Sequence, residues 1–150
     1  MRTLLTARSA EASRVVPAPA VDLFELLAAP RQHAVIDGSG TVADVQPGTP
    51  ERLSAGARFA MQMHWGLPYK ILNEVVEFEE GRRIAWRHFG GHVWRFVLEP
   101  LDAGSTRVTE TFDARPSRAP LVLVLIRAAN RNQRSIEQTL DRLVEWARAR

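Results

Sequence analysis

Residues 82–113 read RRIAWRHFGGHVWRFVLEPLDAGSTRVTETFD, and the pattern of this stretch decides the fold. Tight turns at Gly90-Gly91 and at Ala103-Gly104 divide it into three segments. Aromatic or aliphatic side chains alternate with polar ones along each segment, which is typical of strands with one buried face. The stretch therefore predicts three consecutive antiparallel strands.

The length of the first turn decides which side chains share a face. A two-residue turn at Gly90-Gly91 would mix arginines with aromatic residues on both faces. A three-residue turn with a left-handed glycine instead puts Arg87 and Arg95 together on the other face, so we predict this turn. The expected cross-strand pairs are His88 with His92, Trp86 with Trp94, Ile84 with Phe96, Trp94 with Phe112 and Phe96 with Glu110.

The rest of the chain extends this sheet. Proline stops and helical spacing predict two short helices after the first strand, the first with Val21, Phe24 and Leu27 on its apolar face. Apolar residues at spacings of three and four predict one long helix at residues 118–149. Further strands are expected at residues 11–16, 41–46, 58–65 and 69–79, with a turn at residues 66–68.

These elements predict a single α+β domain over residues 1–150, with a loose tail at residues 1–8. About seven antiparallel strands curling round the C-terminal helix, with the short helices closing one end, would place every apolar face inside. Residues 121–126, LVLVLI, are apolar on all sides. We expect a buried core segment or lid there, with a membrane-surface or dimer contact as the alternative, in a monomer or homodimer.

Composition excludes several classes of function. The chain has no cysteine, so disulfides, thiolate catalysis and cysteine-ligated zinc are excluded. No apolar run approaches the roughly 18 residues of a membrane span, and the N-terminus does not read as a signal peptide, so we expect a cytoplasmic protein with no integral membrane segment. The net charge is +3, but arginines alternate with acidic residues and form no basic stripe, so nucleic acid is not expected as a partner.

Three stretches carry a family resemblance. They are VPAPAVDLFELLAAPRQHAVIDGSGTV at residues 16–42, NEVVEFEEGRRIAWRH at residues 73–88 and LEPLDAGSTRVTETFD at residues 98–113. The chain resembles the SRPBCC, or START-like helix-grip, superfamily, and within it the bacterial polyketide cyclase/dehydrase-type branch. The resemblance implies an apolar cavity between the curved sheet and the C-terminal helix. It does not imply one activity, because the superfamily includes lipid carriers, hormone receptors, cyclases and dehydrases.

The predicted inner face is typical of the wall of a small-molecule pocket. We expect a small hydrophobic ligand of polyketide, lipid or isoprenoid type and no cofactor. The residues expected to contact it are Met61, Met63, Tyr69, Asn73, Trp86, Trp94, Phe96, Phe112 and Gln133. An interaction protein that has filled its own cavity is a further hypothesis.

An enzyme of the cyclase/dehydrase kind is the alternative function, with His88 and Glu110 as its candidate catalytic residues. A histidine oriented by a carboxylate could serve as general base, while Asn73 or Tyr69 donates a hydrogen bond to the developing oxyanion. The structural interpretation is that Glu110 is a buried carboxylate tied to an arginine or to the helix, and that His88 only lines the wall.

The remaining histidines carry weaker signals. His88 and His92 could be two metal ligands, but no third ligand has a matching spacing, so we expect no metal site. His33 is predicted to cap a helix or lie on the surface, with a ligand contact as the alternative. His64 falls on the polar side of its strand and is expected to be solvated.

Overall fold

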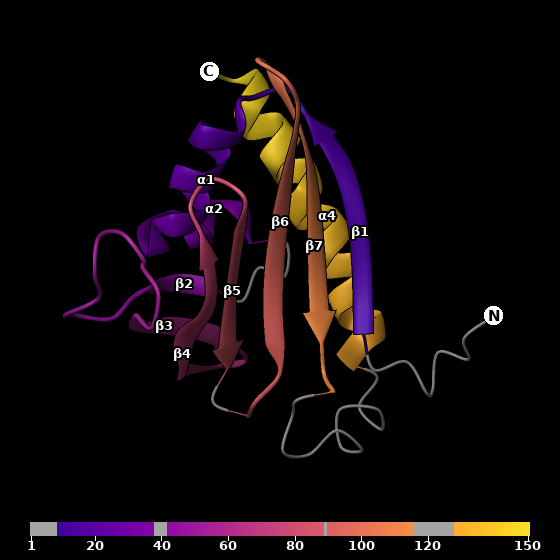
Figure 1. The fold of residues 1–150 in the computed structure, drawn as a ribbon. Coiled ribbons are helices and arrows are strands. Elements are labelled where there is room, and N and C mark those ends of the chain that lie inside the picture. The colour runs from indigo at the N-terminus through magenta and orange to yellow at the C-terminus, as the bar shows by residue number, and fades with distance from the viewer. Residues whose placement is uncertain (1–8, 38–41, 89, 116–127) are drawn as a thin grey trace.

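The computed structural model describes residues 9–37, 42–88, 90–115 and 128–150. In these residues seven strands form one curved antiparallel sheet in the order β1-β7-β6-β5-β4-β3-β2, and α4 lies along one face of it behind β7 and β1 (Figure 1). The strands are β1 (Ser9–Val16), β2 (Val42–Val45), β3 (Arg58–Trp65), β4 (Leu67–Glu79), β5 (Arg83–His88), β6 (Val93–Asp102) and β7 (Ser105–Asp113). The helices are α1 (Ala20–Ala28), the 3-10 turn η1 (Pro30–Gln32), α2 (His33–Ile36) and α4 (Ala128–Arg148). This is the predicted helix-grip α+β fold.

The predicted register of β5, β6 and β7 is confirmed. Trp86 lies opposite Trp94, and Trp94 lies opposite Phe112. The turn after β5 closes with the His88 N–H donating to the His92 carbonyl at 2.9 Å. Gly91 has a φ of 99°, a left-handed conformation that glycine adopts without steric cost, so the turn has the predicted three residues.

The turn predicted at residues 66–68 is wrong. β3 and β4 are joined at Gly66 alone, because Trp65 pairs with Leu67 and Pro68 lies within β4 opposite His64. A proline is tolerated there because β5 ends opposite Asn73, so the start of β4 has a partner strand on one side only.

The helices differ from the prediction in the buried face of α1. Val21 does not belong to the buried face of α1, since it is 63% exposed, while Leu23 and Leu26 are buried. The described part of the C-terminal helix is Ala128–Arg148, and the predicted residues 118–127, including LVLVLI at 121–126, lie outside the described residues. None of the helices in the described part of the chain is long and apolar enough to cross a membrane.

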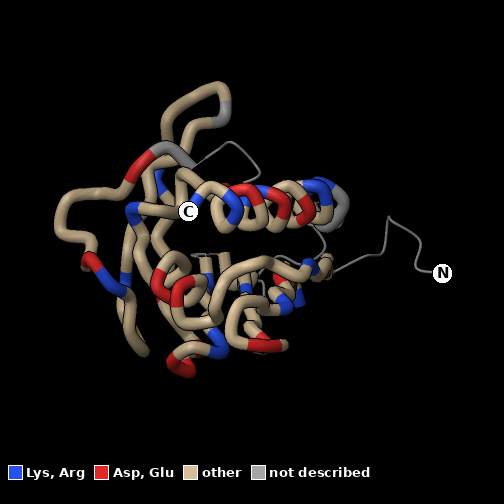
Figure 2. Tube along the Cα trace, turned by 90° about the horizontal axis from the view of Figure 1, so that it is seen from above, with Lys and Arg blue, Asp and Glu red and all other residues tan. Residues whose placement is uncertain are grey.

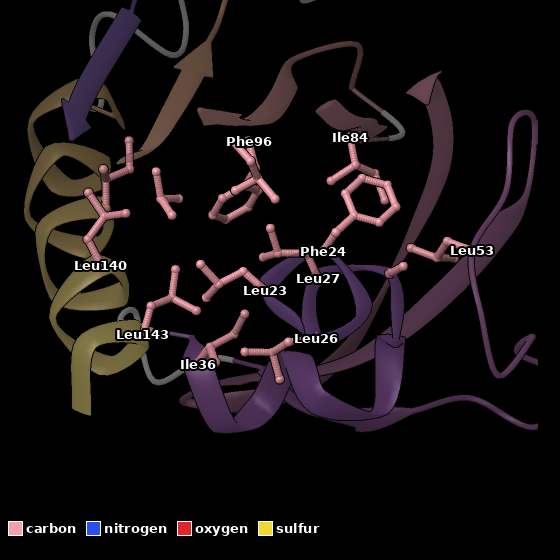
Figure 3. Packing of buried hydrophobic residues seen from close by; sticks show 14 of the residues in the cluster. Leu23, Phe24, Leu26, Leu27, Ile36, Leu53, Ile84, Phe96, Leu140 and Leu143 are labelled. Carbon is pink, nitrogen blue, oxygen red and sulfur yellow. The ribbon is translucent and has the colours of Figure 1, made fainter. Parts of the chain in front are cut away.

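The core lies between the sheet and the helices. Ile136, Leu140 and Leu143 form the buried stripe of α4, and Figure 2 shows charged residues spread along the same helix. Leu140 and Leu143 point toward the short helices, which carry Leu23 and Ile36 (Figure 3). This packing leaves one continuous apolar face of the sheet directed inward.

Candidate functional site

The inner face of the sheet is a mainly apolar wall with a few polar side chains. We call this face the inner wall. It is built from cross-strand rows, because side chains directly opposite one another in paired strands lie on the same face. It carries Phe59, Met61, Met63, Tyr69, Ile71, Asn73, Val75, Ile84, Trp86, His88, His92, Trp94, Phe96, Glu110 and Phe112. The predicted ligand contacts other than Gln133 are therefore all on this one face.

A pocket of about 560 Å³ opens beyond the end of β5. Its volume is in the range of small-molecule sites, which is about 300–1,000 Å³. It lies between the start of β4, which β5 does not reach, and the turn that carries Gly90. The residues that line it are Ala60, Tyr69, Lys70, Ile71, Leu72, His88, Gly90 and His92.

Only Tyr69 and His88 of the predicted site line this pocket. Ile71 was missed, although its alternation with Tyr69 and Asn73 along β4 places it on the same face. His92 was considered only as a metal ligand, and the pairing with His88 across the turn is what brings it to the pocket. The aromatic residues farther along the inner wall pack into the core instead.

Asn73 is a buried polar residue on the inner wall. It lies between Phe59 of β3 and His88 of β5, and only 3% of it is exposed. Its side-chain oxygen Oδ1 is buried and has no hydrogen-bond partner in the part of the chain that the structure describes. Such an unpaired group costs about 1–3 kcal/mol of folding free energy. The fold therefore keeps a hydrogen-bond acceptor beside the pocket at the expense of stability.

Glu110 is a second unpaired polar group on the inner wall. It is 4% exposed and lies opposite Phe96 of β6 and Ala12 of β1. Within residues 9–37, 42–88, 90–115 and 128–150, its Oε2 has no hydrogen-bond partner. Burial, with a smaller contribution from the negative charge of Asp37, raises the pKa of Glu110 well above its usual value. The carboxyl group therefore favours the neutral acid, which can donate a hydrogen bond. Among the described residues, no arginine forms an ion pair with Glu110, contrary to the interpretation that an arginine neutralises it.

His88 and Glu110 share the inner wall but do not form a pair. His88 lies in the row of His92, whereas Glu110 lies in the row of Phe96, two rows away. Four residues of β6 separate these rows, or about 13 Å along the strand. The predicted hydrogen-bonded dyad is therefore not formed.

The two pocket histidines are uncharged at neutral pH. Their ring centres are 4.4 Å apart, and the His92 ring also packs against Phe112 at 5.4 Å. Burial, helped by the neighbouring His92, lowers the pKa of His88 to about 3. Burial also lowers the pKa of His92 to about 4. Each ring then offers one hydrogen-bond donor and one acceptor.

His33 caps the C-terminal end of α1, one of its two predicted roles, but it does not lie on the surface. It is 7% exposed, so the predicted surface position is wrong. Its Nε2 is 2.9 Å from the Leu27 carbonyl, and its ring stacks on Trp86 with ring centres 4.9 Å apart. Burial lowers the pKa of His33. This residue joins α2 to the end of α1 and to the inner wall, a tertiary contact that local sequence does not signal.

Gln133 also differs from the prediction. Its Oε1 accepts from the Glu11 N–H at 3.2 Å, and its Nε2 donates to the Glu11 carbonyl at 3.0 Å. Both the oxygen and the nitrogen of the amide are thus hydrogen-bonded to the backbone of β1, because α4 lies over that edge of the sheet. Gln133 therefore links α4 to β1 by hydrogen bonds, and its amide is not available to bind a ligand.

One protein family matches almost the whole chain. Residues 7–148 match the profile of a family described as polyketide cyclase / dehydrase and lipid transport. The chain belongs to this family. Uncharacterized protein Rv0088 of Mycobacterium tuberculosis is 38% identical to this polyketide cyclase-family chain over 142 residues, which are 90% of this chain and 62% of that protein. The chain thus spans less than two thirds of the length of this curated relative.

Solved structures show the same helix-grip fold. Protein MLL2253 from Mesorhizobium loti has a TM-score of 0.71 at 15% identity, with 95% of this chain and 98% of that chain covered. The di-domain ARO/CYC BexL from the BE-7585A biosynthetic pathway has a TM-score of 0.68 at 20% identity, with 93% of this chain and 47% of BexL covered. At 15–20% identity these neighbours establish the shared fold.

Proposed function

We propose that the protein binds a small hydrophobic molecule, of polyketide, lipid or isoprenoid type, against the inner wall at the pocket beside β4. The observation that carries this proposal is the pocket of about 560 Å³ bordered by Tyr69, Ile71, His88 and His92. Its position at the margin of an aromatic wall offers apolar contact with a few polar groups that fix orientation, which is the usual construction of a ligand site. The family description, which includes lipid transport, supports the proposal.

Native mass spectrometry of the purified chain tests this function. We expect an additional mass of a few hundred daltons that is lost on denaturation, or a rise in Tm with members of a polyketide and lipid panel. A bare-chain mass together with an unchanged Tm across the panel would argue against ligand binding. The same result would favour an interaction protein with a filled cavity.

A cyclase or dehydrase activity is the second candidate. The raised pKa of Glu110 supports it, because burial favours the neutral carboxylic acid, which can donate a hydrogen bond to a ketone oxygen. His88 borders the pocket as an unprotonated imidazole, the form that accepts a proton. However, a general base works best when its pKa is near the operating pH, and that of His88 is about 3. Binding is therefore the better-supported function.

Turnover of a poly-β-ketone substrate distinguishes the two candidates. For an enzyme, His88→Gln and Glu110→Gln should each lower kcat while the protein stays folded. Equal product formation with wild type, with both variants and with no protein would contradict catalysis and leave the binding proposal in place.

A further inference from the structure

Asn73 does not itself line the pocket, but it lies next to two residues that do. Its cross-strand neighbour His88 and its same-face neighbour Ile71 both line the pocket. Its other cross-strand neighbour, Phe59, offers no hydrogen-bond donor. The buried Oδ1 has no hydrogen-bond partner among the described residues. Buried amide oxygens in native proteins are almost always paired with protein, water or ligand, so this atom indicates what the pocket holds.

The hydrogen-bonding chemistry of the Asn73 amide limits which ligand group can bind to it. An amide oxygen needs a donor, and the amide nitrogen beside it needs an acceptor. A hydroxyl group is both, so it can satisfy either end of Asn73 and can also bond to the neighbouring His88 ring. A carboxylate or phosphate oxygen only accepts, so it would leave Oδ1 of Asn73 unpaired.

The charges around Asn73 also disfavour an anionic partner. Among the described residues, no cation faces the inner wall beside Asn73. Arg87 is exposed on the opposite face of β5, and Arg95 forms an ion pair with Glu77 on the outer face. Lys70 borders the pocket, but it is exposed and lies opposite Gln62 on the other face of β4.

The pocket histidines do not supply the missing charge. Burial lowers the pKa of His88 to about 3 and that of His92 to about 4, so both rings are neutral at pH 7. A buried anion without a paired cation is strongly disfavoured. An anionic head group would therefore have to stay in solvent rather than enter beside Asn73.

We propose that the buried end of the ligand is uncharged and carries a hydroxyl group that hydrogen-bonds to Asn73. This selectivity rests on the proposed function, because it assumes that the pocket takes a hydrophobic molecule. It narrows the ligand to neutral alcohols and phenols and excludes free carboxylates and phosphates from the buried end.

Three probes with the same ring system test the proposal: 2-naphthol, naphthalene and 2-naphthoate. Equilibrium dialysis of the full chain at pH 7 gives a Kd for each. We expect 2-naphthol to bind about tenfold more tightly than naphthalene, the gain of one net hydrogen bond. We expect 2-naphthoate to bind more weakly than either.

The variant Asn73→Leu assigns the effect to one residue. It should retain the wild-type affinity for naphthalene and lose the preference for 2-naphthol. Gln62→Leu is the matched control, because it makes the same change on the opposite face of the adjacent strand, and it should keep the preference. Circular dichroism confirms that each variant is folded before its Kd is compared.

The outcomes separate the two proposals. If no probe binds wild type, ligand binding itself is contradicted, and the selectivity with it. If naphthalene binds as tightly as 2-naphthol, if 2-naphthoate binds as tightly as 2-naphthol, or if Asn73→Leu keeps the preference, then the hydroxyl selectivity is wrong while the pocket remains a binding site.

Discussion

Replacing Glu110 by glutamine should stabilise the protein at neutral pH, and the gain should disappear on acidification. Glutamine has nearly the shape of glutamic acid, but its side chain does not ionise. The carboxyl group of Glu110 is buried without a partner for Oε2, and its pKa is raised by burial and by the negative charge of Asp37. Ionisation is thus much harder in the folded than in the unfolded chain.

The sign and size of the effect follow from proton linkage. Above a pH of about 4.5 the unfolded chain releases the Glu110 proton, whereas the folded chain keeps it. The free energy of unfolding of the wild type therefore falls as pH rises, by about 1.4 kcal/mol per pH unit, until the folded pKa is reached. Below a pH of about 4 both states are protonated, and the two proteins should differ little.

Urea denaturation of the wild type and Glu110→Gln between pH 4 and pH 8 measures this difference. The buried histidines also titrate, but in the opposite sense. Their lowered pKa values favour the unfolded chain as pH falls below about 6.5. Taking the variant minus the wild type at each pH removes this shared contribution. Glu99→Gln is the matched control, because its side chain is exposed and its ion pair with Arg107 should contribute at most about 1 kcal/mol at any pH.

A stability difference that does not vary with pH would refute this reasoning. So would a difference of the opposite sign in its pH dependence, with the wild type gaining stability relative to the variant as pH rises, because that result requires an ionised and paired Glu110 in the folded protein.

Three further predictions address the pocket and its framework. Asn73→Leu should raise the free energy of unfolding by about 1 kcal/mol in chemical denaturation, because it removes a buried amide oxygen without a described partner; a loss of stability would mean that this oxygen is satisfied. Gly91→Ala should cost about 1–2 kcal/mol, because Gly91 has a left-handed backbone with a φ of 99°, whereas Gly90→Ala should be nearly neutral; equal costs in thermal denaturation would contradict the assigned turn. Ile71→Trp should fill the pocket and weaken 2-naphthol binding at least tenfold, while Val15→Trp on the exposed outer surface should not; unchanged dialysis binding in Ile71→Trp would exclude this pocket as the site.

The register of the central strands could be predicted from sequence because charge and turn chemistry agree. Only a three-residue turn ending in a left-handed Gly91 separates Arg87 and Arg95 from the aromatic residues. Once that turn is set, the alternation of β6 and β7 brings Glu110 opposite Phe96 without further information. The order of helices and strands in the helix-grip fold could also be predicted. The apolar residues of each element recur at the spacing of a helix or at that of a strand.

The positions that could not be predicted depend on how elements pack. His33 is buried because the reversal after α1 brings it under the Leu27 carbonyl and onto Trp86, which local spacing does not reveal. Gln133 faces β1 because α4 lies over that edge of the sheet. The sequence placed His88 and Glu110 on one face correctly, but a shared face does not fix distance along a strand.

The central claim is that a hydrophobic ligand occupies the pocket beside β4. Isotope-filtered nuclear Overhauser spectroscopy of the labelled chain with unlabelled 2-naphthol tests it most directly. We predict contacts from the probe to the Ile71 methyl groups and to the His88 and His92 rings. Contacts confined to exposed residues such as Val15 and Leu101, or a bound probe with no contact to Ile71, would contradict it.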